Sequence, residues 1–157
     1  MSTTRTFILG VWKVFIMGSL RVEEYLETIY EICQEKKMAK VSDIKKALNI
    51  GSLASITEMV QKLAKMGLVD YEKYRGLTLT EKGLELAKKL ERKHAIIEEL
   101  LTILGVEQET AAKDACKIEH VMSEESVSVI TKFVCFLRED ENKDFIRKFR
   151  KKFKNVL

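Results

Sequence analysis

The spacing of apolar residues changes once along this chain, and the change limits the folds that the chain can adopt. Leu68–Glu72 and Leu77–Leu79 alternate apolar and polar residues as strands do, and Lys73–Gly76 between them is typical of a hairpin turn. On both sides of this hairpin, apolar residues recur at three- and four-residue steps, as in amphipathic helices. The chain also lacks proline, which favours long helices. The sequence therefore predicts a mainly α fold with a small β-wing.

Two short helices are predicted just before the hairpin, after a longer one over residues 22–36. The first opens at Val41, where the Ser42 hydroxyl can cap the helix, and its buried residues are expected to be Ile44, Ala47 and Leu48. The second starts at Ser52 and stops at Gly67, with Ile56, Met59, Val60, Leu63 and Met66 pointing inward. Two short helices joined by a glycine-containing turn resemble a helix-turn-helix, so residues 21–92 are predicted to form a winged helix-turn-helix domain.

After the hairpin, helices are predicted over about 80–101, 107–121, 124–138 and 141–153. Residues 93–157 are therefore predicted to form a second, helical domain. On the third of these helices, an apolar set is expected to form much of a two-fold interface. This set is Val127, Ile130, Phe133, Val134 and Leu137.

Positive charge collects around the predicted winged helix. The chain has a formal net charge of only +4, but residues 36–92 hold 13 Lys or Arg against 7 Asp or Glu. The second helix of a helix-turn-helix enters the major groove, and basic residues around it meet phosphates. The alternative is an ordinary solvated face beside a simple turn. We expect contacts to double-stranded DNA from Ser52, Ala54, Ser55, Thr57, Gln61, Lys62, Lys73, Tyr74 and Arg75.

Both histidines of the chain stand beside carboxylates at helical spacing. Cys116, Glu119 and His120 occupy positions i, i+3 and i+4, and His94 and Glu98 occupy i and i+4. The first helix offers Glu24 and Glu27 at i and i+3. Each residue alone is more ordinary as a polar core residue or as part of a solvated face. Their joint occurrence on three helices predicts a site for a divalent transition metal, because thiolate, imidazole and carboxylate are its usual ligands.

Four segments resemble the diphtheria toxin repressor and manganese transport regulator family: Glu23–Tyr30, Tyr71–Thr80, Arg92–His94 and Asp114–Ser123. Members of that family are homodimeric repressors that bind Fe²⁺ or Mn²⁺ and then bind a palindromic operator near metal-uptake genes. The resemblance implies that the seven candidate metal-binding residues named above are the ligands. It also implies a two-domain architecture without the SH3-like domain of the longer members.

The resemblance implies a mixed ligand set. Glu24 stands where iron-type members carry Met and manganese-type members carry Asp, whereas Cys116 is the iron-type choice where manganese-type members use Glu. Ala112 stands where iron-type members have a further histidine. The turn Asn49–Ser55 is one residue longer than in the family. Because a thiolate is a soft ligand, Fe²⁺ is favoured over Mn²⁺.

The function expected is metal-dependent repression of metal-homeostasis genes, in which the metal ties the first helix to the dimerisation domain. The alternative is a winged-helix regulator without metal that responds to a small molecule or to oxidation of Cys116. A small metalloenzyme is a weaker rival, because the sequence has no nucleophile motif and no phosphate loop. We therefore expect no enzymatic activity.

The two ends of the chain carry separate expectations. Phe7–Leu20 is apolar but is broken by Lys13, is too short to span a membrane, and lacks the cleavage site of a signal peptide. Residues 1–20 are thus an uncertain extension: translation is expected to start at Met17, and an additional helix or strand is the alternative. Three widely spaced cysteines favour a reducing, cytoplasmic setting. The basic terminal helix could pack on the dimerisation domain, contact DNA or meet a membrane, and packing is favoured.

Overall fold

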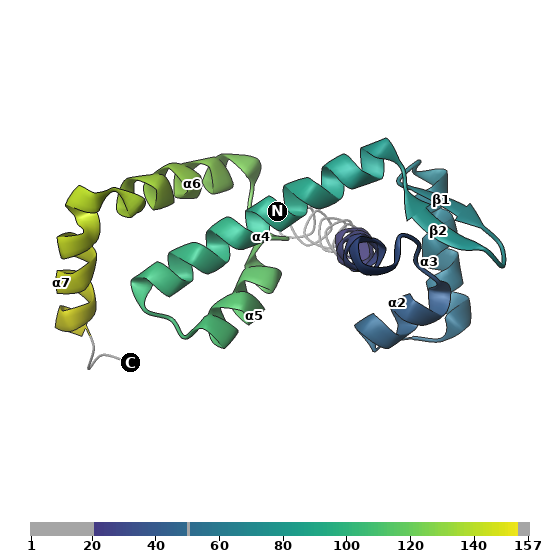
Figure 1. The fold of residues 1–157 in the computed structure, drawn as a ribbon, viewed down its shortest axis with the longest axis horizontal. Coiled ribbons are helices and arrows are strands. Elements are labelled where there is room, and N and C mark those ends of the chain that lie inside the picture. Colours follow the sequence, from purple (N-terminus) through teal and green to yellow (C-terminus); the bar gives the residue numbers. More distant parts are fainter. Residues whose placement is uncertain (1–20, 50, 154–157) are drawn as a thin grey trace, which may run out of the picture. The chain divides into compact units, whose positions relative to one another are not determined.

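The computed structural model of the protein describes residues 21–49 and 51–153 (Figure 1). The chain forms two compact units, here called unit 1 and unit 2, which divide between Leu90 and Glu91 inside the long helix α4 (Glu81–Leu104). The boundary predicted from the sequence, after residue 92, lies in the same helix. The predictions for residues 1–20, including the start at Met17, fall outside the described residues.

Unit 1 is built around one apolar core. It contains the helix of residues 21–36, α2 (Val41–Leu48), α3 (Leu53–Lys65), β1 (Val69–Glu72), β2 (Gly76–Leu79) and the first part of α4. Every one of these elements contributes buried apolar side chains, so α3 and the strands are held on a common body. The largest of these side chains are Leu26, Ile29, Ile44, Ile56, Leu63, Leu68 and Leu77.

The starts of α2 and α3 show how local sequence sets helix ends. Ser52 caps α3 as predicted, since its hydroxyl accepts the backbone N–H of Ser55 at 3.2 Å. The predicted Ser42 cap of α2 is wrong, because α2 already begins at Val41. There the carboxylate of Asp43 accepts the backbone N–H of Lys40 at 3.1 Å.

Two predicted core positions are also wrong. Ala47 of α2 is exposed, and Met66 is 42% exposed. Met66 follows the last residue of α3, so no further helical turn lies beyond it to cover its side chain.

The two strands form the predicted wing. β1 and β2 pair antiparallel, with Val69 opposite Leu79 and Glu72 opposite Gly76. Leu77 also exchanges two backbone hydrogen bonds with Ala39, at 2.8 and 2.9 Å, which ties the wing to the segment before α2. The hairpin tip is therefore presented from a fixed base.

The start of α4 packs tightly on the start of the wing. The Thr80 hydroxyl accepts the backbone N–H of Gly83 and donates to the Gly67 carbonyl at 2.7 Å. A Cβ on Gly83 would lie 1.9 Å from the Leu68 carbonyl oxygen. Only glycine fits at this crossing.

Unit 2 continues α4 from Glu91 and adds α5 (Gln108–Ile118), α6 (Glu124–Arg138), a short 3₁₀ helix (Asp140–Asn142) and α7 (Lys143–Phe153) (Figure 1). The bounds of α6 are those predicted. Two arginines join its helices: Arg138 of α6 donates to the Glu99 carboxylate, and Arg150 of α7 donates to the Thr102 and Ile103 carbonyls at 2.6 and 2.8 Å. The predicted mainly α fold with a β-wing is confirmed.

The predicted interface residues of α6 divide into two groups. Val134 and Leu137 are buried within unit 2, at 0% and 2% exposure, so they belong to its own core. The other three are not buried: Val127 and Ile130 are half-buried and Phe133 is 43% exposed. Phe133 shares one exposed helix face with Val129 and Phe136, which were not predicted, at i, i+4 and i+7. No helix in the described part of the chain is long and apolar enough to cross a membrane.

Candidate functional site

The predicted DNA-reading residues of α3 lie at its exposed start. Ser52, Ala54 and Ser55 are exposed, as are Gln61 and Lys62 further along, and Thr57 is half-buried. The turn before them depends on Gly51, which has φ +67° and on which a Cβ would lie 2.7 Å from the Ser55 Oγ. The first turn of α3 is thus open to solvent and closely backed by the preceding loop.

The hydroxyls of this turn also bind the helix itself. Ser55 Oγ accepts the Ser52 N–H at 3.1 Å and donates to the Ser52 carbonyl at 2.9 Å, and Thr57 Oγ1 donates to the Leu53 carbonyl at 2.7 Å. A hydroxyl that donates to its own helix keeps acceptor capacity for outside donors. These side chains are therefore held in fixed positions on the exposed surface.

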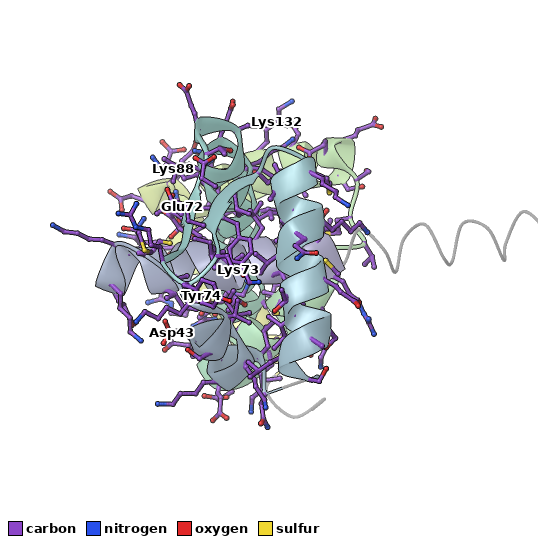
Figure 2. All side chains as sticks on the ribbon, turned by 90° about the vertical axis from the view of Figure 1, so that its right-hand side faces the viewer. Asp43, Glu72, Lys73, Tyr74, Lys88 and Lys132 are labelled. Carbon is purple, nitrogen blue, oxygen red and sulfur yellow. The ribbon has the colours of Figure 1, made fainter. Side chains whose placement is uncertain are left out.

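The wing tip is a basic and aromatic projection. Tyr74 is 91% exposed with φ +73°, and Lys73 Nζ lies 5.2 Å from the centre of its ring (Figure 2). The Arg75 guanidinium lies 3.0 Å from the Glu72 carboxylate, with both side chains mostly exposed. This tip suits contact with a phosphate backbone or the minor groove.

The predicted three-residue group at the end of α5 comes together in unit 2. One ligand atom each of Cys116, Glu119 and His120 lies within 4.8 Å of the others. The helix ends at Ile118, but Glu119 keeps helical dihedral angles and its N–H still donates to the Ala115 carbonyl, so the i, i+3 and i+4 spacing is preserved. The Glu119 side chain is 1% exposed, whereas Cys116 is exposed.

The predicted pair on α4 joins the same group. His94 Nδ1 lies 2.9 Å from Glu119 Oε2, and His94 Nε2 lies 3.5 Å from Glu98 Oε2. On its other side, Glu119 Oε1 lies 3.5 Å from His120 Nε2. The structure thus brings five of the seven predicted ligands together in one network centred on a buried carboxylate.

The other two predicted ligands belong to unit 1. Glu24 is exposed and Glu27 is half-buried on the helix of residues 21–36. Glu24 lies beside the buried Tyr25, and burial, together with that carboxylate, raises the pKa of the tyrosine hydroxyl.

The donor chemistry of the group in unit 2 fits a transition metal. It offers thiolate, imidazole and carboxylate, a mixture that suits late first-row divalent ions better than Mg²⁺ or Ca²⁺. A carboxylate as deeply buried as Glu119 is costly unless positive charge or hydrogen bonds compensate it. The residues present therefore fit a bound divalent cation.

Sequence reasoning missed one residue that supports this group. Lys93, next to His94, donates from Nζ to the Met122 carbonyl at 2.9 Å. This bond fastens the turn after His120 to α4. Lys93 and Met122 are 29 residues apart, so local spacing gave no signal for this bond. Lys93 does lie within the Arg92–His94 segment that resembles the family.

Comparison with known proteins matches both units to one family. The iron dependent repressor N-terminal DNA binding domain matches residues 17–77, and the iron dependent repressor metal binding and dimerisation domain matches residues 80–148. The HTH-type transcriptional regulator MntR of Bacillus velezensis is 42% identical over 140 residues, which cover 88% of this chain and 98% of that protein. MntR of Bacillus subtilis is 42% identical over 125 residues, or 80% of this chain and 87% of that protein.

Solved structures agree with this assignment. The manganese regulator SloR has a TM-score of 0.63 and 33% identity, covering 73% of this chain and 54% of its own. IdeR of T. acidophilum has a TM-score of 0.62 and 29% identity, covering 70% of this chain and 52% of its own. The two domain matches together span most of the chain. The protein therefore belongs to the iron dependent repressor family, and is a metal-dependent, homodimeric, DNA-binding transcriptional repressor of metal homeostasis.

Proposed function

We propose that the five clustered side chains of unit 2 form the metal site of this repressor, and that it binds Fe²⁺ in preference to Mn²⁺. The observation that carries the proposal is the buried Glu119 carboxylate, which lies between His94 and His120 with Cys116 and Glu98 at the edges of the group. Random placement of polar residues would seldom collect these donors around one buried carboxylate.

The chain's own residues define what the site can do. Glu119 is held by His94 on α4 and by its position at the end of α5, so it presents two oxygens from a fixed place. A bound divalent cation supplies the positive charge that compensates the acidic donors. Glu24 and Glu27 are further ligands in this proposal through the family resemblance, which makes the helix of residues 21–36 the link to DNA binding.

The preference for Fe²⁺ is argued from Cys116. A given set of nitrogen, oxygen and sulfur donors binds Fe²⁺ more tightly than Mn²⁺, and a thiolate among the donors increases that difference. Relatives include the manganese regulator SloR, so Mn²⁺ is the direct competitor to test. The expected outcome is a response to both ions at different concentrations.

Anaerobic titration of operator binding tests the proposal. The probe is a palindromic duplex selected in vitro by the metal-loaded protein, and each titration uses Fe²⁺ or Mn²⁺. The wild-type protein is expected to need less Fe²⁺ than Mn²⁺, and Cys116→Glu is expected to move the ratio at least ~10-fold towards Mn²⁺ by replacing a soft donor with a hard one. Cys135→Ser is the matched control, because it removes an exposed thiol of α6 that is not in the group.

Two results would contradict the proposal. Operator affinity that does not change with either metal favours the metal-free alternative, in which a small molecule or oxidation of Cys116 is sensed. An unchanged metal ratio in Cys116→Glu removes the argument for Fe²⁺ while leaving a metal-dependent repressor.

The DNA interface in this proposal is the start of α3 together with the wing tip. Ser52, Ala54, Ser55, Thr57 and Gln61 are candidates for the major groove, and Lys62, Lys73, Tyr74 and Arg75 are candidates for the backbone. Tyr74→Ala is expected to weaken binding to operator and random duplexes alike, because a wing contact with the backbone carries little sequence information. We also propose that the repressor acts in the cytoplasm and has no enzymatic activity.

A further inference from the structure

The terminal helix α7 carries an unusual density of positive charge. Its eleven residues include six Lys or Arg and one Asp, a net charge of +5. All six basic side chains are exposed. The metal site and the predicted DNA interface leave this surface without a role.

The apolar side of α7 faces other apolar residues of unit 2: Ile146 and Phe149 are half-buried there, whereas Phe145 is 57% exposed. Phe145, Ile146 and Phe149 line an apolar pocket with α4 and α6, whose contributions are Ile103, Leu104, Phe133 and Leu137. Arg150 adds a polar anchor, because its guanidinium donates to the last carbonyls of α4, at Thr102 and Ile103. The helix α7 is therefore fixed on unit 2, and the side opposite Ile146 and Phe149 faces away from the rest of the unit.

The side turned away is cationic. On a helix, Arg147, Lys148 and Lys151 are neighbours at i, i+1 and i+4, opposite Ile146 and Phe149. Asp144 pairs with Arg147 at 2.9 Å, and Asp140 pairs with Lys143 at 2.5 Å. Among the described residues, no ion pair involves Lys148 or Lys151.

We propose that this cationic face of α7, centred on Lys148 and Lys151, is a second DNA-binding surface that contacts phosphates without reading sequence. The positive charge of this face is complementary to DNA, the polyanion that the family already binds. Lysines on a helix that is fixed to unit 2 suit contact with a regular row of phosphates. A membrane surface is the other polyanion. It is disfavoured because an interfacial helix must insert its apolar face, and two residues of that face, Ile146 and Phe149, are already half-buried where α7 meets α4 and α6.

The test is the salt dependence of DNA binding by the full-length dimer. The variant Lys148→Gln/Lys151→Gln removes two charges per protomer from the exposed side and leaves the pocket and Arg150 intact. On a random-sequence duplex without metal, we expect affinity to fall about 10-fold at 0.1 M salt, and the slope of log K against log salt to become shallower by about 2 to 4. Lys148→Arg/Lys151→Arg is expected to keep wild-type values.

The control is Lys113→Gln/Lys132→Gln, which makes the same change in net charge on α5 and α6. If both Gln pairs change the slope equally, the effect is one of overall charge and the proposal is overturned. It is also overturned if the α7 pair changes nothing, or if it abolishes binding to phosphatidylserine vesicles while DNA binding is intact. Since the random duplex needs no metal, failure of metal-dependent operator binding would show separately and would concern the proposed metal site instead.

Discussion

Unit 1 and unit 2 bury different kinds of side chain. Among the described residues of unit 1, the buried side chains are apolar except for Thr28, whose hydroxyl donates to the Glu24 carbonyl at 2.9 Å. In unit 2 the buried set is small, and it includes the carboxylate of Glu119. In the described part of unit 2, six large apolar side chains are also exposed: Leu104, Val121, Val129, Phe133, Phe136 and Phe145.

This difference indicates what each unit needs in order to be stable. A core that is apolar throughout is complete within its own chain, as in unit 1. A buried carboxylate is costly without a compensating charge, and a stripe of exposed apolar residues is typical of an interface. We therefore expect unit 2 to gain stability from a bound cation and from a second copy, and unit 1 to be stabilised by its own packing.

The largest effect is expected from Glu119→Gln. The amide keeps the size of the side chain but removes the charge at the centre of the group in unit 2. Metal-activated operator binding should fall about 100-fold, close to 3 kcal/mol, because allosteric coupling between sites commonly amounts to 1–3 kcal/mol. Metal-dependent fluorescence anisotropy on labelled operator measures this directly.

Glu109→Gln is the matched control for that prediction. It makes the same chemical change on α5, at an exposed carboxylate that pairs with Lys113 at 2.6 Å. A metal response that survives in Glu119→Gln and matches this control would show that unit 2 buries its carboxylate for packing alone, and the contrast between the units would weaken.

Much of the fold could be predicted because it is local. The 3.6-residue spacing located α6 at its observed bounds, and the change to a two-residue spacing located the wing. The predicted cap at Ser42 and the predicted burial of Ala47 and Met66 were wrong for a shared reason. Each lies near a helix end, where capping and the exit of the chain decide orientation, and these depend on contacts such as Asp43 with Lys40.

The group of candidate ligands in unit 2 could be predicted in part. The i, i+3 and i+4 spacing is enough to place Cys116, Glu119 and His120 together, since helical geometry is local. The approach of His94 to Glu119 spans 25 residues, so no local spacing could place the two together. It was predicted only from the joint occurrence of such residues on several helices and from the family resemblance. Spacing also could not distinguish the buried Val134 and Leu137 from the exposed Phe133 and Phe136, because α6 is apolar around much of its circumference.

A second prediction concerns the dense packing of unit 1. Gly83→Ala should lower the free energy of unfolding by about 3 kcal/mol, the upper range for overpacking, because the new methyl group would meet the Leu68 carbonyl at the crossing of α4 and β1. Urea unfolding followed by circular dichroism measures the loss.

Gly67→Ala separates steric crowding from backbone strain. Gly67 has φ +69°, but a Cβ there would meet nothing within 4 Å, so only the left-handed backbone disfavours alanine, at about 1 kcal/mol. If the two variants lose equal stability, the crossing at Gly83 is looser than the structure indicates.

A third prediction concerns the exposed stripe on α6. Phe136 is 48% exposed in the single chain, so Phe136→Ser should change the stability of the protomer little. If the stripe forms the two-fold interface, the dissociation constant of the dimer should rise about 10-fold, which corresponds to about 1.4 kcal/mol, because apolar area is lost from both copies. Sedimentation velocity over a concentration series measures this. Met66→Ser, at 42% exposure in unit 1, should leave the dimer constant unchanged, and equal weakening by both variants would contradict the interface.

The smallest effect tests whether charge matters in unit 1 at all. Asp43 accepts the Lys40 N–H at 3.1 Å and pairs with Lys36 at 3.0 Å, and the Lys36 hydrogen bond holds the pKa of this carboxyl below its usual value. A lowered pKa in the folded state stabilises the protein above the ordinary pKa of about 3.9, and the contribution disappears as pH falls through the lowered pKa. Asp43→Asn should therefore lower the free energy of unfolding by about 1 kcal/mol or less at pH 7, since the pair is partly exposed, and by almost nothing near pH 2.

Urea unfolding at both pH values, with and without 1 M NaCl, separates the two contacts, because salt screens the Lys36 pair more than the hydrogen bond to Lys40. A loss that stays the same at low pH would mean that Asp43 acts through its shape at the start of α2, and that the stability of unit 1 rests on packing even at its surface.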